Sequence, residues 1–209
     1  MKKVLIVILT AAATLCQAQD ADPRNKLYLG IKAGYNYSSV YDTQEETFEA
    51  KSKLGIAAGV FATIPFGKHL GVHPEILFAQ RGFKRTGTLL GSSYELARTS
   101  SYLDLPVLIA LKPNRFLTLV AGPQFSFLLK QKDVFAYSAT SIQQEEAFKN
   151  DNIRTNMLCA IAGLDINLNP VVLGLRSGWD MQHNNGDGTS TSPRYKNAWF
   201  QGTVGLGFR

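Results

Sequence analysis

The stretch Leu27-Tyr28-Leu29-Gly30-Ile31-Lys32-Ala33-Gly34-Tyr35-Asn36-Tyr37-Ser38 alternates between two kinds of residue. Its odd positions are apolar or aromatic, and its even positions are mostly small or polar and include one lysine. A period of two predicts a β-strand, because successive side chains of a strand point to opposite faces. One face of this strand is therefore expected to meet an apolar medium, and the other a confined polar space.

Seven further stretches repeat this pattern. They cover approximately residues 54–64, 70–80, 102–111, 117–129, 158–168, 171–181 and 200–208. Within the fourth predicted strand, Pro106 is expected to mark a bulge or a locally unpaired site, because proline cannot donate to the strand ladder. The total of eight strands predicts an all-β fold, an eight-stranded antiparallel up-and-down transmembrane β-barrel.

The connections between the predicted strands alternate in length. Those at 65–69, 112–115 and 169–170 are short, and those at 39–52, 83–101, 131–156 and 182–196 are long and polar. Short periplasmic turns and longer external loops are typical of bacterial outer-membrane barrels. Both termini are then expected in the periplasm, and the protein in the cell outer membrane.

Aromatic residues are expected to form two girdles at the membrane interfaces. The predicted outer girdle contains Tyr35, Tyr37, Phe78, Phe125, Phe127, Trp179 and Phe200, and the inner one Phe66, Phe116 and Phe208. The alternative is a soluble, lipocalin-like barrel whose apolar face surrounds a ligand. We favour the membrane barrel, because the polar face is rich in glycine and carries only isolated charges, as a narrow interior requires.

The first residues have the pattern of a secretory signal. A basic start at Met1–Lys3 precedes a short apolar run, and small residues at Cys16 and Ala18 suit a signal-peptidase site. We predict a signal peptide at 1–18 and an outer-membrane β-barrel domain at 19–209. Lipidation of Cys16 is disfavoured, because the bulky Leu15 precedes it. Removal of the signal leaves Cys159 as the single cysteine, so no intramolecular disulfide is expected.

The formal net charge of +6 raises the question of nucleic-acid binding. Lysine and arginine are spread over predicted strand ends and loops and form no clustered stripe, so no nucleic-acid partner is expected.

Five charged residues fall on the predicted interior face: Lys32, Glu75, Asp104, Asp165 and Arg176. A buried charge is costly unless it is paired and hydrogen-bonded, so we expect a polar network in the lumen. Arg176 is expected to bind Asp165 on the adjacent strand and Lys32 to reach across the lumen. Glu75 and Asp104 are left to share a proton or a lysine. We interpret the network as a salt-bridged plug, with a proton or small-ion path as the alternative.

No catalytic, cofactor-binding or metal-binding residues are expected. Ser177, Asp180 and His183 are the set that a lipid-modifying enzyme would use, but Ser177 and Asp180 have opposite parity on one strand. His69 and His73 lack a second ligand at metal spacing. The loop at 184–192 lacks the closing glutamate of a calcium loop. Acidic stretches at 44–46 and 143–146 are interpreted as solvated loop segments, with binding of a partner or of divalent ions as alternatives.

Four stretches resemble the PorT-like family of outer-membrane β-barrel proteins, which is common in Bacteroidota. They are Gly30–Asn36, His73–Leu77, Tyr102–Leu108 and Gly174–Gly178. The resemblance implies an eight-stranded outer-membrane barrel, and one branch of the family assists a gliding and secretion apparatus. The chain departs from the usual aromatic terminus of such barrels by ending on Arg209, one residue after Phe208.

The expected role is structural or loop-mediated interaction without catalytic activity. The alternatives are an accessory component of an outer-membrane secretion or assembly system, a lipid-modifying enzyme and a narrow pore. The expected partners are outer-membrane lipids, the assembly machinery during biogenesis, and a protein at the outer loops or periplasmic turns.

Overall fold

The computed structural model describes residues 23–44, 50–89, 92–137, 140–146, 154–184 and 194–208. The predicted signal peptide, Arg209, most of the loop at 184–192 and the glutamates at 45 and 46 lie outside these ranges. No helix among the described residues has the length and apolar character needed to cross a membrane.

The described chain consists of a short 3₁₀ helix at Pro23–Asn25 followed by nine strands. They are β1 (Tyr28–Gln44), β2 (Ala50–Pro65), β3 (Leu70–Leu89), β4 (Ser92–Leu111), β5 (Leu117–Tyr137), β6 (Thr140–Glu146), β7 (Asn156–Asn167), β8 (Val171–Asp180) and β9 (Arg194–Phe208). All of the strand pairings are antiparallel.

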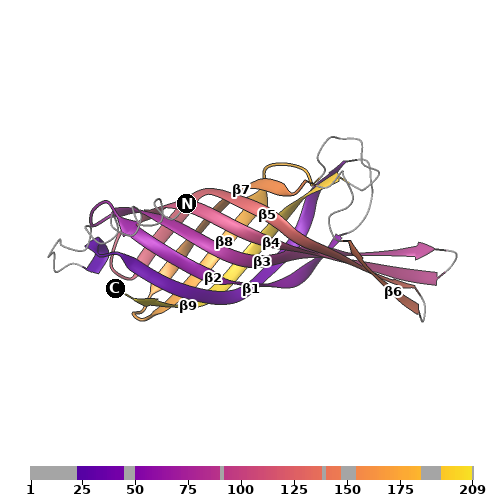
Figure 1. The fold of residues 1–209 in the computed structure, drawn as a ribbon, viewed down its shortest axis with the longest axis horizontal. Coiled ribbons are helices and arrows are strands. Elements are labelled where there is room, and N and C mark those ends of the chain that lie inside the picture. Colours follow the sequence, from indigo (N-terminus) through magenta and orange to yellow (C-terminus); the bar gives the residue numbers. More distant parts are fainter. Residues whose placement is uncertain are drawn as a thin grey trace, which may run out of the picture.

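Eight of these strands form a closed ring. In this ring each strand pairs with its two neighbours, in the order β1, β2, β3, β4, β5, β7, β8 and β9. The last strand, β9, pairs with β1 and closes the ring. Among the described strands, β6 pairs with the outer part of β5 alone, and it lies outside the ring (Figure 1). The predicted eight-stranded antiparallel barrel is therefore confirmed.

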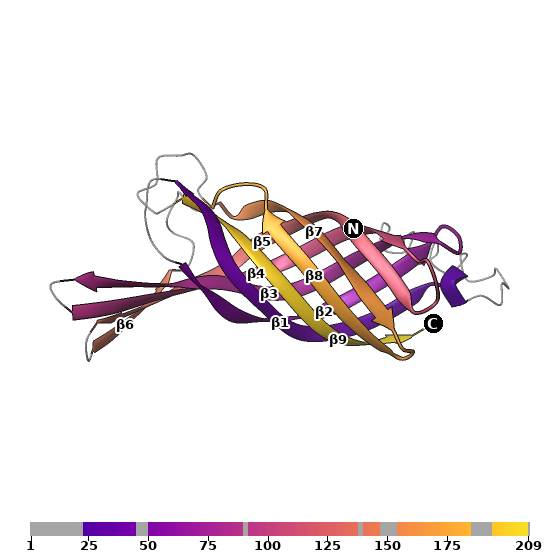
Figure 2. The same cartoon turned by 180° about the vertical axis from the view of Figure 1, so that it is seen from behind.

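Two of the predicted long loops are largely strand. β3 and β4 continue as a paired hairpin out to Leu89 and Ser92, and β5 continues to Tyr137, where β6 folds back on it. Figures 1 and 2 show these segments projecting well beyond the rest of the ring. We call this projection, residues 83–89, 92–101, 130–137 and 140–146, the outer arm. Sequence reasoning assigned it to loops because its polar residues hide the apolar alternation that identified the other strands.

The apolar face of the sheet points out of the barrel. Ile31 is 55% exposed and Val204 is 59% exposed, whereas Lys32 and Thr203, their neighbours in the chain, are 7% and 6% exposed. A lipocalin-like barrel would have the reverse arrangement, so that alternative is wrong. The expected girdle aromatics that the structure describes, such as Tyr37 and Phe208, are also exposed on the outer wall.

Glycines on the interior face make room for the few large side chains inside the barrel. A Cβ on Gly178 would lie 2.3 Å from Cζ2 of Trp199, and one on Gly30 would lie 2.4 Å from Cζ of Phe61. The narrow interior predicted from the glycine-rich face is thus filled by neighbouring side chains, as in other small barrels.

Pro106 lies at a gap in the β3–β4 ladder. Pairing is interrupted between Pro74–Val107 and Leu77–Asp104 and resumes in the same register, so the site is locally unpaired and not bulged. The register shift of β4 lies instead on its other side, between Ser101 and Tyr102 against β5.

Candidate functional site: the barrel interior

Buried charged residues are gathered at two levels of the interior. We call the lower group, near the short turns, the inner ionic cluster: Lys32, His73, Glu75, Asp165 and Arg176. Alternation places each of these side chains inside, on β1, β3, β7 and β8.

Glu75 and Asp165 are bridged by a single guanidinium group. Arg176 lies 2.8 Å from Asp165 Oδ1 through Nη1, and its Nη2 donates to Glu75 Oε1 at 3.3 Å. On the other side, Lys32 Nζ donates to Glu75 Oε2 at 2.5 Å. Two cations thus hold two buried carboxylates, which satisfies the requirement that buried charges be paired.

His73 completes the inner ionic cluster. Its ring stacks on Phe61 with centroids 5.4 Å apart, its Nδ1 is 2.8 Å from the Thr63 hydroxyl, and its Nε2 is 3.0 Å from Glu75 Oε1. The histidine is therefore held by contacts on three sides.

The upper group, which we call the outer ionic cluster, is built around Arg81 and consists of Arg81, Asp104 and Asp180. Arg81 pairs with Asp104, and its Nη1 is 4.0 Å from Asp180 Oδ1. Its guanidinium carbon lies 3.8 Å from the ring centroid of Trp199 and 4.7 Å from that of Tyr102. Cation–π contacts of this kind strengthen when water is excluded.

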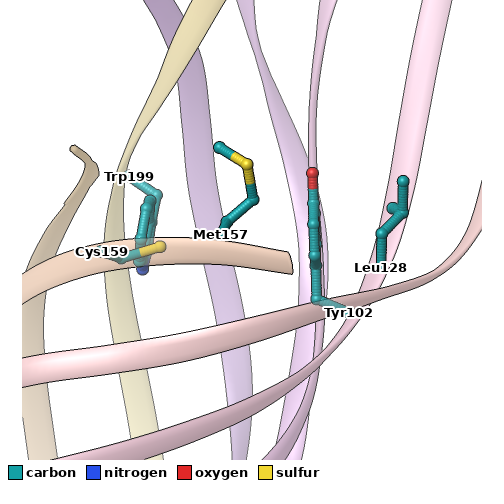
Figure 3. Close-up of a cluster of buried hydrophobic side chains, with 5 residues drawn as sticks. All are labelled: Tyr102, Leu128, Met157, Cys159 and Trp199. Atoms are coloured by element: carbon teal, nitrogen blue, oxygen red, sulfur yellow. The ribbon is translucent and has the colours of Figure 1, made fainter. Parts of the chain in front are cut away.

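Tyr102 and Trp199 also belong to an apolar cluster with Leu128, Met157 and Cys159 (Figure 3). The charged centre of the outer cluster is therefore bordered by an apolar layer.

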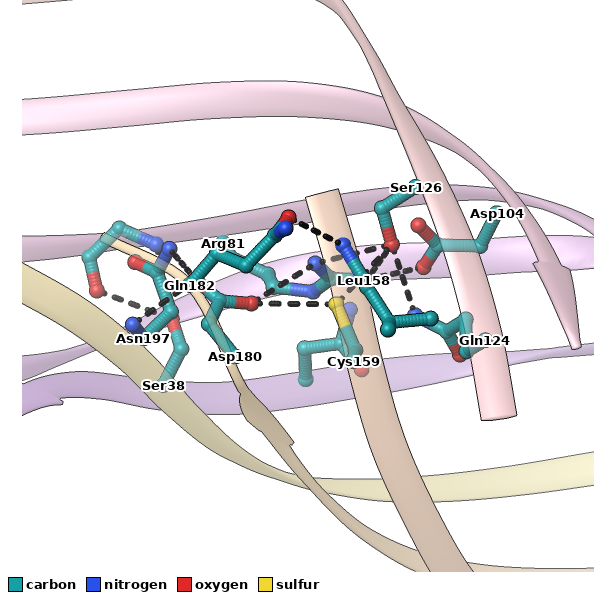
Figure 4. Close-up of polar contacts among 12 residues, drawn as sticks. Ser38, Arg81, Asp104, Gln124, Ser126, Leu158, Cys159, Asp180, Gln182 and Asn197 are labelled. Carbon is teal, nitrogen blue, oxygen red and sulfur yellow. Dashed lines mark hydrogen bonds and ion pairs between the residues drawn. The ribbon is translucent and has the colours of Figure 1, made fainter. Parts of the chain in front are cut away.

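Asp180 is held by several donors (Figure 4). Asn197 donates to it through its backbone nitrogen at 2.9 Å and through its side chain at 2.5 Å, and the thiol of Cys159 donates at 3.2 Å. Ser126 lies 3.5 Å from the same sulfur and accepts a hydrogen bond from Gln124 at 3.0 Å. This network joins the neighbouring strands β5, β7, β8 and β9 along the inner wall.

The structure brings together four of the five predicted interior charges and separates the fifth. Lys32, Glu75, Asp165 and Arg176 share one cluster, whereas Asp104 lies in the other with Arg81 and shares neither a proton nor a lysine with Glu75. Sequence reasoning missed Arg81 because the predicted third strand ended one residue before it. Its odd number, which gives it the same parity as Glu75, was the available signal.

The candidate triad is not assembled. Asp180 is fully buried in the lumen, while Ser177 alternates to the outer wall and His183 follows the end of β8. The carbonyl of His183 accepts a hydrogen bond from Arg154. Within the described ranges, no group of three or more His, Cys, Asp or Glu residues is placed to hold a metal ion.

At the end of the barrel with the short turns, a cavity of about 30 Å³ remains. Four basic residues contribute to its lining: Arg24, Lys26, Lys112 and Arg115. The chain at the 3₁₀ helix is tied across this mouth, because Lys112 Nζ donates to the carbonyl of Arg24 at 2.6 Å. The cavity has space for about one water molecule.

Ring closure, outward apolar side chains and an ionic interior together define a membrane-spanning barrel, because a lipid-exposed sheet must have no open edge. The family model for the outer membrane protein β-barrel domain matches residues 17–183. The chain belongs to this family. It is an outer-membrane protein, and by the rule for such barrels its short turns face the periplasm and its outer arm the cell exterior.

Solved outer-membrane proteins resemble the chain at low sequence identity. The attachment invasion locus protein Ail of Yersinia pestis is 16% identical with a TM-score of 0.48, over 88% of this chain and 99% of that one. Neisserial surface protein A is 10% identical with a TM-score of 0.45, over 87% and 97%. OprG of Pseudomonas aeruginosa is 14% identical with a TM-score of 0.38, over 87% and 96%. No curated protein sequence matches the chain.

Arg81→Leu is expected to destabilise the folded barrel by about 3–5 kcal/mol, because it leaves two buried carboxylates without their cation. Urea unfolding in phospholipid vesicles measures the change. The single variant Asp104→Asn and the double variant Arg81→Leu/Asp104→Asn complete a double-mutant cycle, which measures the interaction energy between the two residues. A loss below about 1 kcal/mol for Arg81→Leu would show that the outer ionic cluster does not stabilise the fold.

Proposed function

We propose that the protein is an interaction protein of the outer membrane, in which a sealed barrel holds the outer arm outside the cell to bind a partner. The observation that carries the proposal is the uneven length of the strands. β3, β4 and β5 have 20, 20 and 21 residues, whereas β7 and β8 have 12 and 10. A strand of about 9–11 residues suffices to cross a membrane, so the additional length serves the exterior.

The interior supports an anchoring role better than a conducting one. Two ionic clusters lie across the lumen, and the guanidinium groups of both arginines are buried against carboxylates. Eight-stranded barrels generally fill their interiors in this way.

One face of the outer arm carries apolar side chains that suit a protein partner. The rings of Tyr94 and Phe135 stack with centroids 5.6 Å apart, and Leu96 is the backbone partner of Phe135. The opposite face is charged and holds the exposed pair of Lys84 and Glu95. Aromatic residues are enriched at protein interfaces, so the Tyr94 face is the proposed contact surface.

β6 adds a second feature that suits binding. Among the strands that the structure describes, it pairs with β5 alone, so its other backbone edge has no strand partner within these ranges. Addition of a strand to such an edge is a common mode of peptide recognition.

A secretion role is the second candidate, favoured by the PorT-like motifs together with the basic inner mouth. We propose that the chain lies on the PorT-like branch and that Lys26 and Arg115, which line this mouth, contact an acidic periplasmic partner.

We further propose that the protein has no catalytic activity. The separation of Ser177 from Asp180 by the barrel wall supports this, because a hydrogen-bonded triad requires its members on one side.

A photo-cross-linking amino acid at position 96 is expected to form a discrete protein adduct on intact cells. The same amino acid at position 97, on the opposite face of the outer arm, is expected to form no adduct. Phe135→Ser should abolish the adduct from position 96, because it removes part of the apolar face. Gel shifts after irradiation measure both. The absence of an adduct at 96, or the same adduct at both positions, would contradict binding through the Tyr94 face.

Deletion of the gene is expected to reduce export of secreted cargo if the second candidate is correct, and Lys26→Gln/Arg115→Gln should reproduce much of the loss. Quantitative proteomics of culture medium measures the export. Normal export in the deletion strain would exclude this role.

Replacement of Ser177 and His183 by alanine together is expected to leave the surface lipids unchanged. Mass spectra of lipids extracted from wild-type and variant cells test this, with the deletion strain as a reference. A lipid species that disappears in both the variant and the deletion strain would show that the protein modifies lipids.

A further inference from the structure

Five lysines gather on the outward face of the sheet at the outer ends of β2, β3 and β5. We call them the outer lysine cluster: Lys51, Lys53, Lys84, Lys130 and Lys132. Lys51 and Lys84 are direct partners in the β2–β3 ladder. Lys84 and Lys132 each follow an inward residue, Phe83 and Gln131, and so alternate to the outer wall.

Lys53 joins these strands by reaching across β3. Its Nζ donates to the hydroxyl of Thr99 on β4 and to the carbonyl of Arg98 at 3.4 Å. Thr99 is the backbone partner of both Gly82 on β3 and Lys132 on β5. The Lys53 ammonium therefore crosses β3 beside a residue without a side chain and ends next to the position of Lys132.

The lysines are close enough to affect one another. Burial, followed by the positive charge of Lys84, lowers the pKa of Lys53, and Lys132 acts in the same direction. Asp133 and Glu95 oppose the shift. Like charges at this separation are unfavourable, and an anion between them would relieve the repulsion.

Described acidic residues lie beside the outer lysine cluster. Glu95 lies 2.9 Å from Lys84, and Glu145 is the register partner of Lys132 on β6. Asp133 is bound by Arg98, its Oδ2 lying 2.6 Å from Nη2. Among the described side chains, Glu95 and Asp133 each already face a basic partner, and the positive charges of Lys84 and Lys132 still act on Lys53.

The cluster begins where the apolar belt ends. Leu54, 65% exposed, directly follows Lys53 in β2, and Leu129, 47% exposed, is followed by Lys130 in β5. The belt must lie in hydrocarbon, so the lysines lie at the level of the outer headgroups, where phosphate groups of the outer-leaflet glycolipid are found. Basic residues beside a membrane segment are attracted to anionic headgroups.

We propose that the outer lysine cluster is a binding site for the phosphate groups of the outer-leaflet glycolipid, whose acyl chains lie against the apolar wall below. The site is independent of the proposed Tyr94 contact surface, which lies on the opposite face of the outer arm.

The test is native mass spectrometry of the folded full-length barrel released from detergent, titrated with bisphosphorylated lipid A and with its dephosphorylated form. The wild-type protein is expected to retain the bisphosphorylated form at a concentration at least about tenfold lower. Lys53→Gln/Lys84→Gln/Lys132→Gln should lose that preference, since each lysine near a membrane surface contributes about fivefold in affinity.

Matched controls distinguish binding at the outer lysine cluster from an effect of the protein's overall charge. Lys26→Gln/Lys68→Gln/Arg115→Gln removes the same charge near the short turns and should bind as the wild type does. The triple Lys→Arg variant of residues 53, 84 and 132 should restore binding. The faster gel migration of the unheated protein verifies folding, and Lys132→Gln alone, with about a fivefold loss, replaces any triple variant that does not fold.

Three results would overturn the proposal. They are equal retention of both lipid forms, unchanged retention by the Gln variants, and displacement of the lipid by millimolar inorganic phosphate, which would indicate a site for free phosphate.

Discussion

Pairing of β9 with β1 closes the sheet, and the other features of the protein depend on that closure. From Leu29–Phe208 to Tyr41–Lys196 the two end strands are in continuous register, so no backbone edge of the ring is left to the lipid. In hydrocarbon an unpaired peptide group has no water to bind, so an open sheet could not remain there. Closure also fixes the diameter, and a ring of eight strands leaves space for side chains and little else.

That narrow space explains the composition of the interior. Large interior residues such as Trp199 require glycine on the neighbouring strand, and charges meet between strands that are far apart in the chain. Arg176 and Arg81 each serve two carboxylates, and each carries a planar group whose several donors can do so. The ionic clusters therefore link strands of the ring through buried ion pairs.

The two ends of the barrel and its outer wall offer the surfaces that other molecules can reach. At the inner end, the 3₁₀ segment and four basic residues form a small positively charged mouth. At the outer end, three long ring strands and β6 form an arm with the stacked Tyr94 and Phe135 on one face and the Lys84–Glu95 pair on the other. The two faces suit different neighbours, since an aromatic surface favours protein and a lysine-rich surface favours phosphate.

The sequence by itself determined the barrel, because the alternation of side chains is a local property that any one strand displays. It also identified Lys32, Glu75, Asp165 and Arg176 as interior charges, since parity along a strand fixes the side that a residue faces. It did not reveal the role of Arg81 or the outer arm, whose polar strands lack the apolar alternation. The choice of ionic partners was decided only by the tertiary structure. Partners are set by the stagger between strands and by which residues meet across the lumen, and neither is encoded in the local pattern of a single strand.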